Sequence, residues 1–426
     1  MKKNILLKNS TIYLSSTAIN SGLLFLLTPI MTYLISPEEM GKVAIFQSLT
    51  VFLYSIVGLG SSSAIVRYSY DVDVNKLGEY IGESFIILIS SVMIIFFFIL
   101  LSSDYLSEWL GLDELWLYLS LSIAFFNYLF LLLLGLYQRK GNAKKYALLQ
   151  IGNGIINFVL SIYLMCFIYQ AGGGRILGWI ISIGATGLIA VYILYRSYAI
   201  RFKNVVEIRK KLFRYGIPLI PHELGTFLIV WLAVIIVKEK LDLASVGLFL
   251  VSLQLSSILG VVCDAANKAY VPWLFGKLKQ ERVDKIRIVK MTYMAMVGLI
   301  VISVVSFVLS PIVMPILLPG EYANVVEVFT ILVLGQAFGG MYLLVTNYIF
   351  FSKKTKFLPF ITLLSGMVNF LLLFYLIDAF GLVGAAYAFT ASRFVQFILT
   401  WLAANVSYPM PWSLKISGAD FGHKTY

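Results

Sequence analysis

The sequence predicts an all-α membrane protein with about 12 transmembrane helices in two six-helix bundles, related as a parallel pseudo-repeat. Hydrophobic residues make up 60% of the 426 residues and charged residues 13%, whereas soluble domains average about 45–50% and about 25%. Lys and Arg concentrate on one side of the predicted membrane. Motifs of the first half also recur in the second half. Together these observations indicate a duplicated, multi-pass membrane protein.

A membrane-spanning helix needs about 20 mainly apolar residues. Backbone groups inside lipid must be satisfied within their own segment, so helices are predicted and open sheets are excluded. The basic start MKKNILLK precedes an apolar run too long for a signal peptide, and we expect it to be retained as a first span. Twelve segments meet the length requirement: 10–35, 41–66, 80–102, 115–137, 146–169, 176–196, 215–237, 245–267, 288–310, 324–351, 358–378 and 381–405.

The positions of Lys and Arg predict the orientation. If the N-terminus is cytoplasmic, all but five of the 33 basic residues lie on the cytoplasmic side. This bias predicts a multi-pass membrane protein with both termini in the cytoplasm. The net charge of +12 is then a topology signal, and we expect no nucleic-acid partner. The exceptions are Lys42, Arg175, Lys238 and Lys240, which are expected on the outer face, and Arg393 inside the last segment.

A repeat divides the chain into two halves. GIINF (154–158) and GMVNF (366–370) share G-x-x-N-F, and GGGRILGW (172–179) and AFGLVGAA (379–386) occupy matching places before the next segment. Six spans per half give both halves the same orientation, which is typical of transporters that rock about a central site. Duplication without transport would leave the same trace. We expect an N-terminal bundle over 1–200, a cytoplasmic linker over 201–214, a C-terminal bundle over 215–405 and a cytoplasmic tail over 406–426.

Five stretches in order resemble the bacterial oligosaccharide flippases of the polysaccharide transporter family: YLISPEEMGKVAIFQSL, GLGSSSAIVRYSY, RYGIPLIPHEL, NKAYVPWLF and NFLLLFYLIDAFGLVGAAYAFTAS. This family includes the O-antigen and capsule repeat-unit flippases. It shares the multidrug/oligosaccharidyl-lipid/polysaccharide exporter superfamily with the multidrug and toxin extrusion antiporters. The resemblance covers nearly the whole chain. It implies translocation of polyprenyl-diphosphate-linked oligosaccharide units from the cytoplasmic to the outer leaflet of the bacterial cytoplasmic (inner) membrane, for O-antigen or capsular polysaccharide biosynthesis.

The same resemblance implies the partners. These are the lipid-linked oligosaccharide and membrane lipid, with H⁺ or Na⁺ as a candidate coupling ion and a polysaccharide polymerase as a candidate protein partner. The alternative is a cation-coupled multidrug antiporter, although the first segment contains no acidic residue to bind a coupling ion. The chain has no G-x-x-x-x-G-K-[ST] loop and no His/Cys set with metal spacing, so we expect no cofactor, no metal and no enzymatic activity.

Arg393 is the main candidate site residue. It lies about 12 residues, or about 18 Å, into the last segment, near the middle of the bilayer. Facing lipid there would cost at least about 2.5 kcal/mol, so it should face protein or a wet cavity. It is either a cavity cation that binds the diphosphate or an acidic sugar, or a structural partner of an acid such as Glu223 or Asp264.

Two further cations end equivalent segments at the cytoplasmic interface, Arg67 and Lys268. A diphosphate in the inner leaflet would lie at that depth, where a guanidinium can bind it in a bidentate manner. The alternative for both is a snorkelling interface anchor, which is the favoured interpretation for Lys268.

PLIPHELG (218–225) suggests a kink, because proline removes backbone hydrogen bonds early in a segment. His222 and Glu223 then lie about 11 Å inside the cytoplasmic edge. This pair could carry a coupling proton, or it could form an ordinary interhelical hydrogen bond. Asp264 is a further candidate polar residue of the cavity, although it lies near a segment end, like Glu83, and snorkelling is the favoured interpretation for both.

Small residues and amides predict helix packing. GRILG (174–178) and GQAFG (335–339) match G-x-x-x-G, which is typical of close helix contact. Asn157 and Asn369 are expected to form hydrogen bonds between helices.

Overall fold

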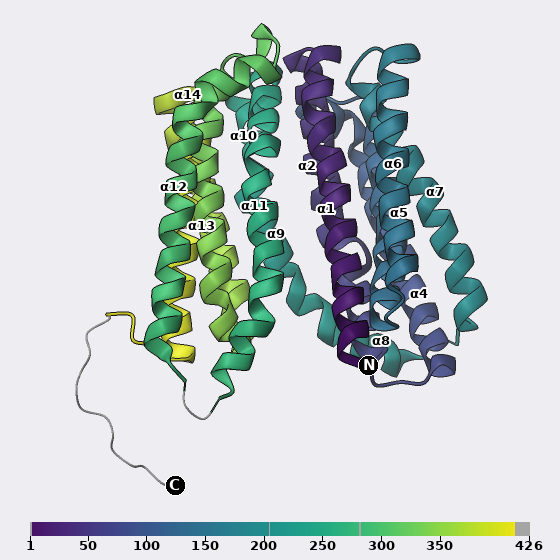
Figure 1. Cartoon of the computed structure of the whole chain (residues 1–426). Helices are drawn as coiled ribbons and strands as arrows, with labels where there is room; N and C mark the ends of the chain where they lie inside the picture. Colours follow the sequence, from purple (N-terminus) through teal and green to yellow (C-terminus); the bar gives the residue numbers. More distant parts are fainter. Residues whose placement is uncertain (1, 204, 281–282, 414–426) are drawn as a thin grey trace.

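A computed structural model describes residues 2–203, 205–280 and 283–413, and within this part of the chain every regular element is helical. Figure 1 shows two groups of helices standing side by side, one purple to teal and one teal to yellow. The N-terminus and the last described residues lie at the same end of the molecule. We call that end the terminal side and the opposite end the distal side.

The first half runs from α1 to α7. Its spans alternate in direction and are joined by short connections. Its elements are α1 (Lys2–Leu34), α2 (Pro37–Ile56), η1 (Val57–Gly60), α3 (Ser61–Tyr68), α4 (Val74–Leu110), α5 (Glu114–Arg139), α6 (Ala143–Phe167) and α7 (Gly172–Tyr198).

The second half begins with an interrupted span and ends with the longest helix. Its elements are α8 (Val206–Gly216), η2 (Ile217–Leu219), α9 (Ile220–Val230), α10 (Leu232–Lys240), α11 (Leu243–Leu278), α12 (Lys285–Leu317), η3 (Gly320–Tyr322), α13 (Val325–Phe351), η4 (Thr355–Phe357) and α14 (Leu358–Ser407).

The described residues contain 11 helical stretches long and apolar enough to cross a membrane, and the last of them, Thr355–Ser407, has 53 residues. Gly381 in α14 has φ 57° and ψ −138°. A methyl group placed on Gly384 would lie 2.0 Å from the Leu376 carbonyl oxygen, a proximity that requires the chain to reverse between them. About 12 membrane helices in two bundles are therefore confirmed.

Gly381 should be intolerant of a side chain. Its backbone angles are accessible almost only to glycine, so Gly381→Ala is expected to lower the free energy of unfolding by about 1–3 kcal/mol. No atom lies within 4 Å of the added methyl, so the effect isolates backbone strain. The apparent melting temperature in detergent would report it. Gly298→Ala, which also meets nothing within 4 Å and has no positive φ, is the matched control. Equal melting temperatures for the two variants would contradict the prediction.

Two spans are broken on the terminal side. The second span, expected to be continuous over 41–66, is interrupted because Gly58, Leu59 and Gly60 all have positive φ. The seventh span is interrupted by the 3-10 turn at Ile217–Leu219, where its prolines predicted a kink. The two breaks touch, since a methyl on Gly60 would lie 2.7 Å from the Gly216 carbonyl oxygen.

The linker between the halves packs closely on α4. A methyl on Gly78 would lie 2.2 Å from the Tyr198 carbonyl oxygen, and one on Gly82 would lie 2.2 Å from that of Arg201. Glu83 follows these glycines. It is fully buried, in contrast to the snorkelling side chain expected from the sequence.

The Glu83 carboxylate binds the linker directly. It accepts hydrogen bonds from the Val205 backbone N–H at 2.7 Å and from Arg209 Nε at 3.0 Å. The beginning of α8 is therefore attached to the first half, whereas α9 packs against α14 in the second.

The halves meet on the distal side. A methyl on Gly41 of α2 would lie 2.0 Å from the Leu243 carbonyl oxygen at the start of α11, so these backbones touch. The buried Tyr322 hydroxyl donates to the Ile35 carbonyl at 2.9 Å. Desolvation raises the pKa of Tyr322, which keeps this donor protonated. Toward the terminal side the two groups of helices diverge, with α8 and α9 crossing between them (Figure 1).

Candidate substrate cavity

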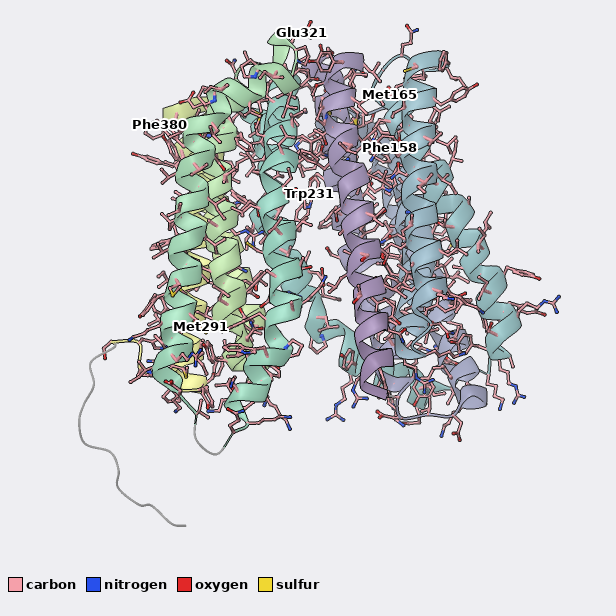
Figure 2. All side chains as sticks on the ribbon, in the orientation of Figure 1. Phe158, Met165, Trp231, Met291, Glu321 and Phe380 are labelled. Carbon is pink, nitrogen blue, oxygen red and sulfur yellow. The ribbon has the colours of Figure 1, made fainter. Side chains whose placement is uncertain are left out.

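A cavity of about 660 Å³ lies between the two halves. Side chains from α1, α2, α6 and α7 form one wall, and residues of α11 together with Trp231 form the other. Figure 2 shows Trp231 between the two bundles. A cavity at the interface of two halves is a common position for a transporter binding site.

Arg175 is the one cation that lines this cavity within the described residues. Its side chain is only 5% exposed. Nη1 donates to Asn157 Oδ1 at 2.9 Å and to Ser161 Oγ at 3.1 Å, and the guanidinium lies 5.8 Å from the centre of the Trp179 ring. In the described part of the chain, no carboxylate forms an ion pair with it. The cavity therefore contains a positive charge held by neutral groups.

The sequence places Arg175 just before a span, on the predicted outer face. In the structure it lies in the first turn of α7 on the distal side, and its side chain is buried. Glycines bring α7 against α6: a methyl on Gly174 would lie 2.8 Å from Met165 N, and one on Gly178 would lie 2.6 Å from Ser161 N. This close approach carries Arg175 into the interior. The GRILG motif predicted the contact, and that prediction is confirmed. In GQAFG only Gly335 makes such a contact, with Phe389, whereas nothing lies within 4 Å of Gly339.

Uncharged polar groups supply the rest of the polar lining. Thr28 Oγ1 donates to Gln254 Oε1 at 2.6 Å, and Gln254 Nε2 donates to Gln47 Oε1 at 3.5 Å. These bonds join α1 and α2 of the first half to α11 of the second. Among the residues lining the cavity that the structure describes, none is Asp or Glu.

The paired asparagines make contacts between helices, as expected. Asn157 of α6 binds Arg175 of α7, and Asn369 Nδ2 donates to the Leu228 and Ile229 carbonyls of α9 at 2.8 and 3.2 Å. The asparagine of the G-x-x-N-F motif thus lines the cavity in the first half and joins two packed helices in the second.

Arg393 lies elsewhere, on α14 against α13, and does not line this cavity. Its Nη1 donates to Gln396 Oε1 at 3.0 Å, and its guanidinium lies 5.3 Å from the centre of the Phe389 ring. The buried Nε has no hydrogen-bond partner in the part of the chain that the structure describes. Neither Glu223 nor Asp264 pairs with it, so the ion-pair interpretation is wrong for this structure. Substrate binding by Arg393 stays a prediction.

Arg67 and Lys268 each pair with an acid one helical turn away. Arg67 Nη1 lies 2.7 Å from Asp71 Oδ2, and Lys268 Nζ lies 2.5 Å from Asp264 Oδ2. All four side chains are about half exposed. Arg67, Lys268 and Asp264 lie outside the cavity lining, and their roles in substrate binding stay predictions.

His222 Nδ1 lies 3.2 Å from Thr362 Oγ1, so α9 and α14 share this contact. Glu223 is exposed. Neither residue lines the cavity, and a coupling role for either stays a prediction.

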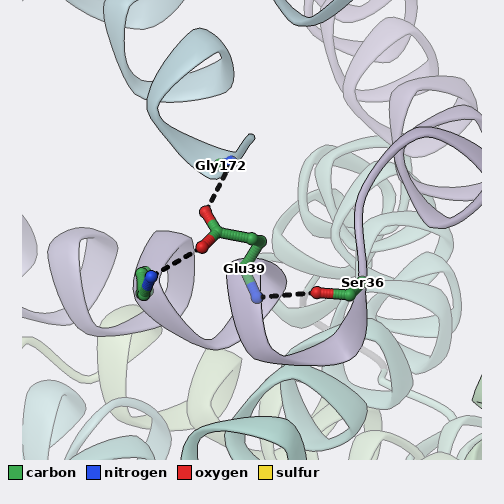
Figure 3. A network of polar contacts seen from close by, with 4 residues as sticks. Ser36, Glu39 and Gly172 are labelled. Atoms are coloured by element: carbon green, nitrogen blue, oxygen red, sulfur yellow. Dashed lines mark hydrogen bonds and ion pairs between the residues drawn. The ribbon is translucent and has the colours of Figure 1, made fainter. Parts of the chain in front are cut away.

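A polar network on the distal side holds the wall that carries Arg175. Glu39 of α2 accepts a hydrogen bond from the Gly172 N–H at the start of α7 (2.9 Å) and pairs with Lys42 (2.6 Å) (Figure 3). The Glu39 backbone N–H donates to Ser36 Oγ, which caps α2. The carboxylate satisfies one of the unpaired N–H groups at the helix start. The position of α7 is thereby tied to the distal end of α2.

Comparison with known proteins identifies the family. Residues 6–278 match the family described as "Polysaccharide biosynthesis protein". An "Uncharacterized membrane protein" of Haemophilus influenzae is 27% identical over 374 residues, which cover 85% of this chain and 88% of that protein. "Lsg locus putative protein 1" of the same organism is 24% identical over 369 residues, with the same coverage.

Solved structures share the fold. One is titled "Inward-facing conformation of a multidrug resistance MATE family transporter of the MOP superfamily"; its TM-score is 0.67 at 16% identity, covering 96% of this chain and all of that one. The outward-facing conformation of a transporter described in the same words has a TM-score of 0.62 at 16% identity, covering 95% of both chains. At such identities the similarity shows the fold alone. The family match covers more than half of the chain, and this protein belongs to the polysaccharide biosynthesis protein family, with the fold of the MOP-superfamily transporters.

Proposed function

We propose that this protein translocates polyprenyl-diphosphate-linked oligosaccharide units from the cytoplasmic to the outer leaflet of the bacterial inner membrane by alternating access. The observation that carries the proposal is the interbundle cavity, whose buried Arg175 has no acidic neighbour in the lining. The family match supports a role in polysaccharide biosynthesis.

The cavity favours an anion over a cationic drug. A guanidinium in a poorly hydrated site attracts negative charge more strongly than it would in water. Arg can also donate several hydrogen bonds to a phosphate or carboxylate group. A cation entering the same space would meet repulsion and no carboxylate among the lining residues. These points favour the flippase over a multidrug antiporter.

The arrangement of the halves supports a loading stage. They touch on the distal side and diverge on the terminal side, which is the predicted cytoplasmic face. A lipid-linked substrate of the cytoplasmic leaflet would enter from there. Rocking about the linker would then break the distal contacts, and an H⁺ or Na⁺ gradient is the candidate energy source.

The test is flipping of a polyprenyl-diphosphate-linked oligosaccharide in proteoliposomes. Arg175→Gln should lower the initial rate at least about tenfold, because one charge-assisted hydrogen bond contributes about 1.5–3 kcal/mol. Arg175→Lys should retain part of the rate, since the charge is kept. Arg393→Gln should have the smaller effect, because Arg393 lies outside this cavity.

Two results would refute the proposal. One is wild-type protein that transports only cationic drugs and no lipid-linked sugar. The other is an Arg175→Gln variant that flips the substrate at the wild-type rate.

A further inference from the structure

Two tryptophans from opposite halves line the same cavity. Trp179 comes from α7, and Trp231 from the break between α9 and α10. Both side chains are partly exposed. Neither indole N–H has a hydrogen-bond partner among the residues that the structure describes. Each half thus presents an aromatic face and an unused donor to one space.

The protein holds both tryptophans in place before any ligand arrives. The Trp179 ring packs edge to face on the fully buried Phe46, with ring centres 6.0 Å apart, and Phe46 in turn packs on Trp116 at 6.1 Å. Trp231 is fixed through its backbone: its carbonyl accepts from Ser48 Oγ of α2 at 3.1 Å, and its N–H donates to Phe227 O at 2.8 Å. Such preorganisation lowers the ordering cost of binding.

Three asparagines of the lining have spare hydrogen-bonding capacity. Asn20 has no hydrogen-bond partner in the described part of the chain. Asn153 and Asn157 use their oxygens as acceptors, from Thr186 at 3.1 Å and from Arg175 at 2.9 Å. A side-chain amide has two donors and an acceptor, so each can still bind a ligand.

We infer that this cavity binds the sugar part of the substrate, with Trp179 and Trp231 as the residues that select for it. A sugar ring has an apolar C–H face and a rim of hydroxyl groups. Fixed aromatic faces complement the first, and unpaired amides and indole N–H groups complement the second. Arg175 is the single cation in the described lining, so before translocation the lining offers more groups suited to a sugar than to a diphosphate.

The depth of the site agrees with this assignment. Arg175 and Trp179 lie in the first two turns of α7 on the distal side, whereas α7 continues to Tyr198 on the terminal side. At 1.5 Å per residue the helix extends about 28 Å beyond Trp179. A headgroup in the predicted cytoplasmic leaflet would therefore lie below the cavity, with its glycan projecting up into it. The inference rests on the proposed function.

The test is binding of two radiolabelled probes to purified protein in detergent. One is a polyprenyl diphosphate carrying a neutral disaccharide, and the other is the same lipid without sugar. Trp231→Leu and Trp179→Leu should each weaken binding of the sugar-linked probe about tenfold, through loss of aromatic contact area. Both should leave binding of the sugar-free probe within about twofold, which also shows that the variants are folded. Trp231→Phe should retain most of the affinity.

Trp273→Leu is the matched control, since Trp273 lies on α11 outside the cavity and is 37% exposed. Equal loss for both probes, or no loss for the sugar-linked probe, would overturn the inference. A wild-type protein that binds the sugar-linked probe through these tryptophans but does not flip it would refute the proposed function and support the sugar site. The two claims can therefore fail separately.

Discussion

Replacing Gly247 with alanine is expected to reduce transport at least about tenfold, by preventing closure of the distal side. A methyl group there would lie 1.9 Å from the Pro37 carbonyl oxygen, a distance that no real contact tolerates. The obstacle is backbone, so no side chain can move aside. Separation of α2 from α11 would disfavour the distally closed state, and each 1.4 kcal/mol of such bias changes its population ratio tenfold. Gly41→Ala should behave alike, since its methyl would lie 2.0 Å from the Leu243 carbonyl oxygen.

The measurement combines flipping with access to the cavity. Thr28→Cys, in a background without Cys166 and Cys263, would be labelled by an impermeant thiol reagent added from outside. Labelling should rise in the Gly247→Ala protein. Gly276→Ala on the same helix is the control, because nothing lies within 4 Å of its methyl group. Wild-type flipping by Gly247→Ala, with no gain in outside labelling, would show that this contact does not form the gate.

Loss of the Glu83 carboxylate should have the largest effect on stability. Glu83 is fully buried, and it binds both Arg209 and the Val205 N–H. Removing one charge of a buried ion pair costs about 3–5 kcal/mol, because the other charge loses its counter-charge. The Arg209 side chain is 26% exposed, so we expect the lower end, about 3 kcal/mol, for Glu83→Gln.

A lower apparent melting temperature in detergent would measure this loss. Faster proteolysis within residues 199–205 would show that the linker has detached from α4. Glu79→Gln is the matched control on the same helix. Glu79 pairs with Lys203 at 2.7 Å, and the Lys203 side chain is 51% exposed, so the change should cost less than about 1 kcal/mol. Comparable losses from the two substitutions would contradict the role of Glu83.

Prolines and glycines predicted helix breaks and close helix contacts correctly where their effect on the backbone is local. Pro218 and Pro221 predicted an interruption near Ile217–Leu219, and GRILG predicted the close approach of α7 to α6. Trp231 has no such local signal. The helix breaks at Trp231, between α9 and α10, where Ser48 of the other half donates a hydrogen bond to the Trp231 carbonyl. No feature of the segment around Trp231 predicts that contact.

For charged residues, too, the local sequence did not predict the environment. Asp264 and Glu83 both lie near segment ends, yet Asp264 is about half exposed beside Lys268, whereas Glu83 is fully buried against the linker. Hydropathy gives the same expectation for both. Their burial differs because the linker covers α4 at Gly78 and Gly82, next to Glu83.

By itself the sequence determined the membrane class, the number and approximate limits of the spans, the two related halves and the family resemblance. These properties follow from hydropathy, proline and glycine, which act over a few consecutive residues. Only the tertiary structure decided that Arg175 faces the cavity and Arg393 does not, and that Trp179 and Trp231 meet there. The environment of a charge or an aromatic ring in a membrane bundle depends on the rotation of its helix and on the neighbours that cover it, and those neighbours come from distant parts of the chain.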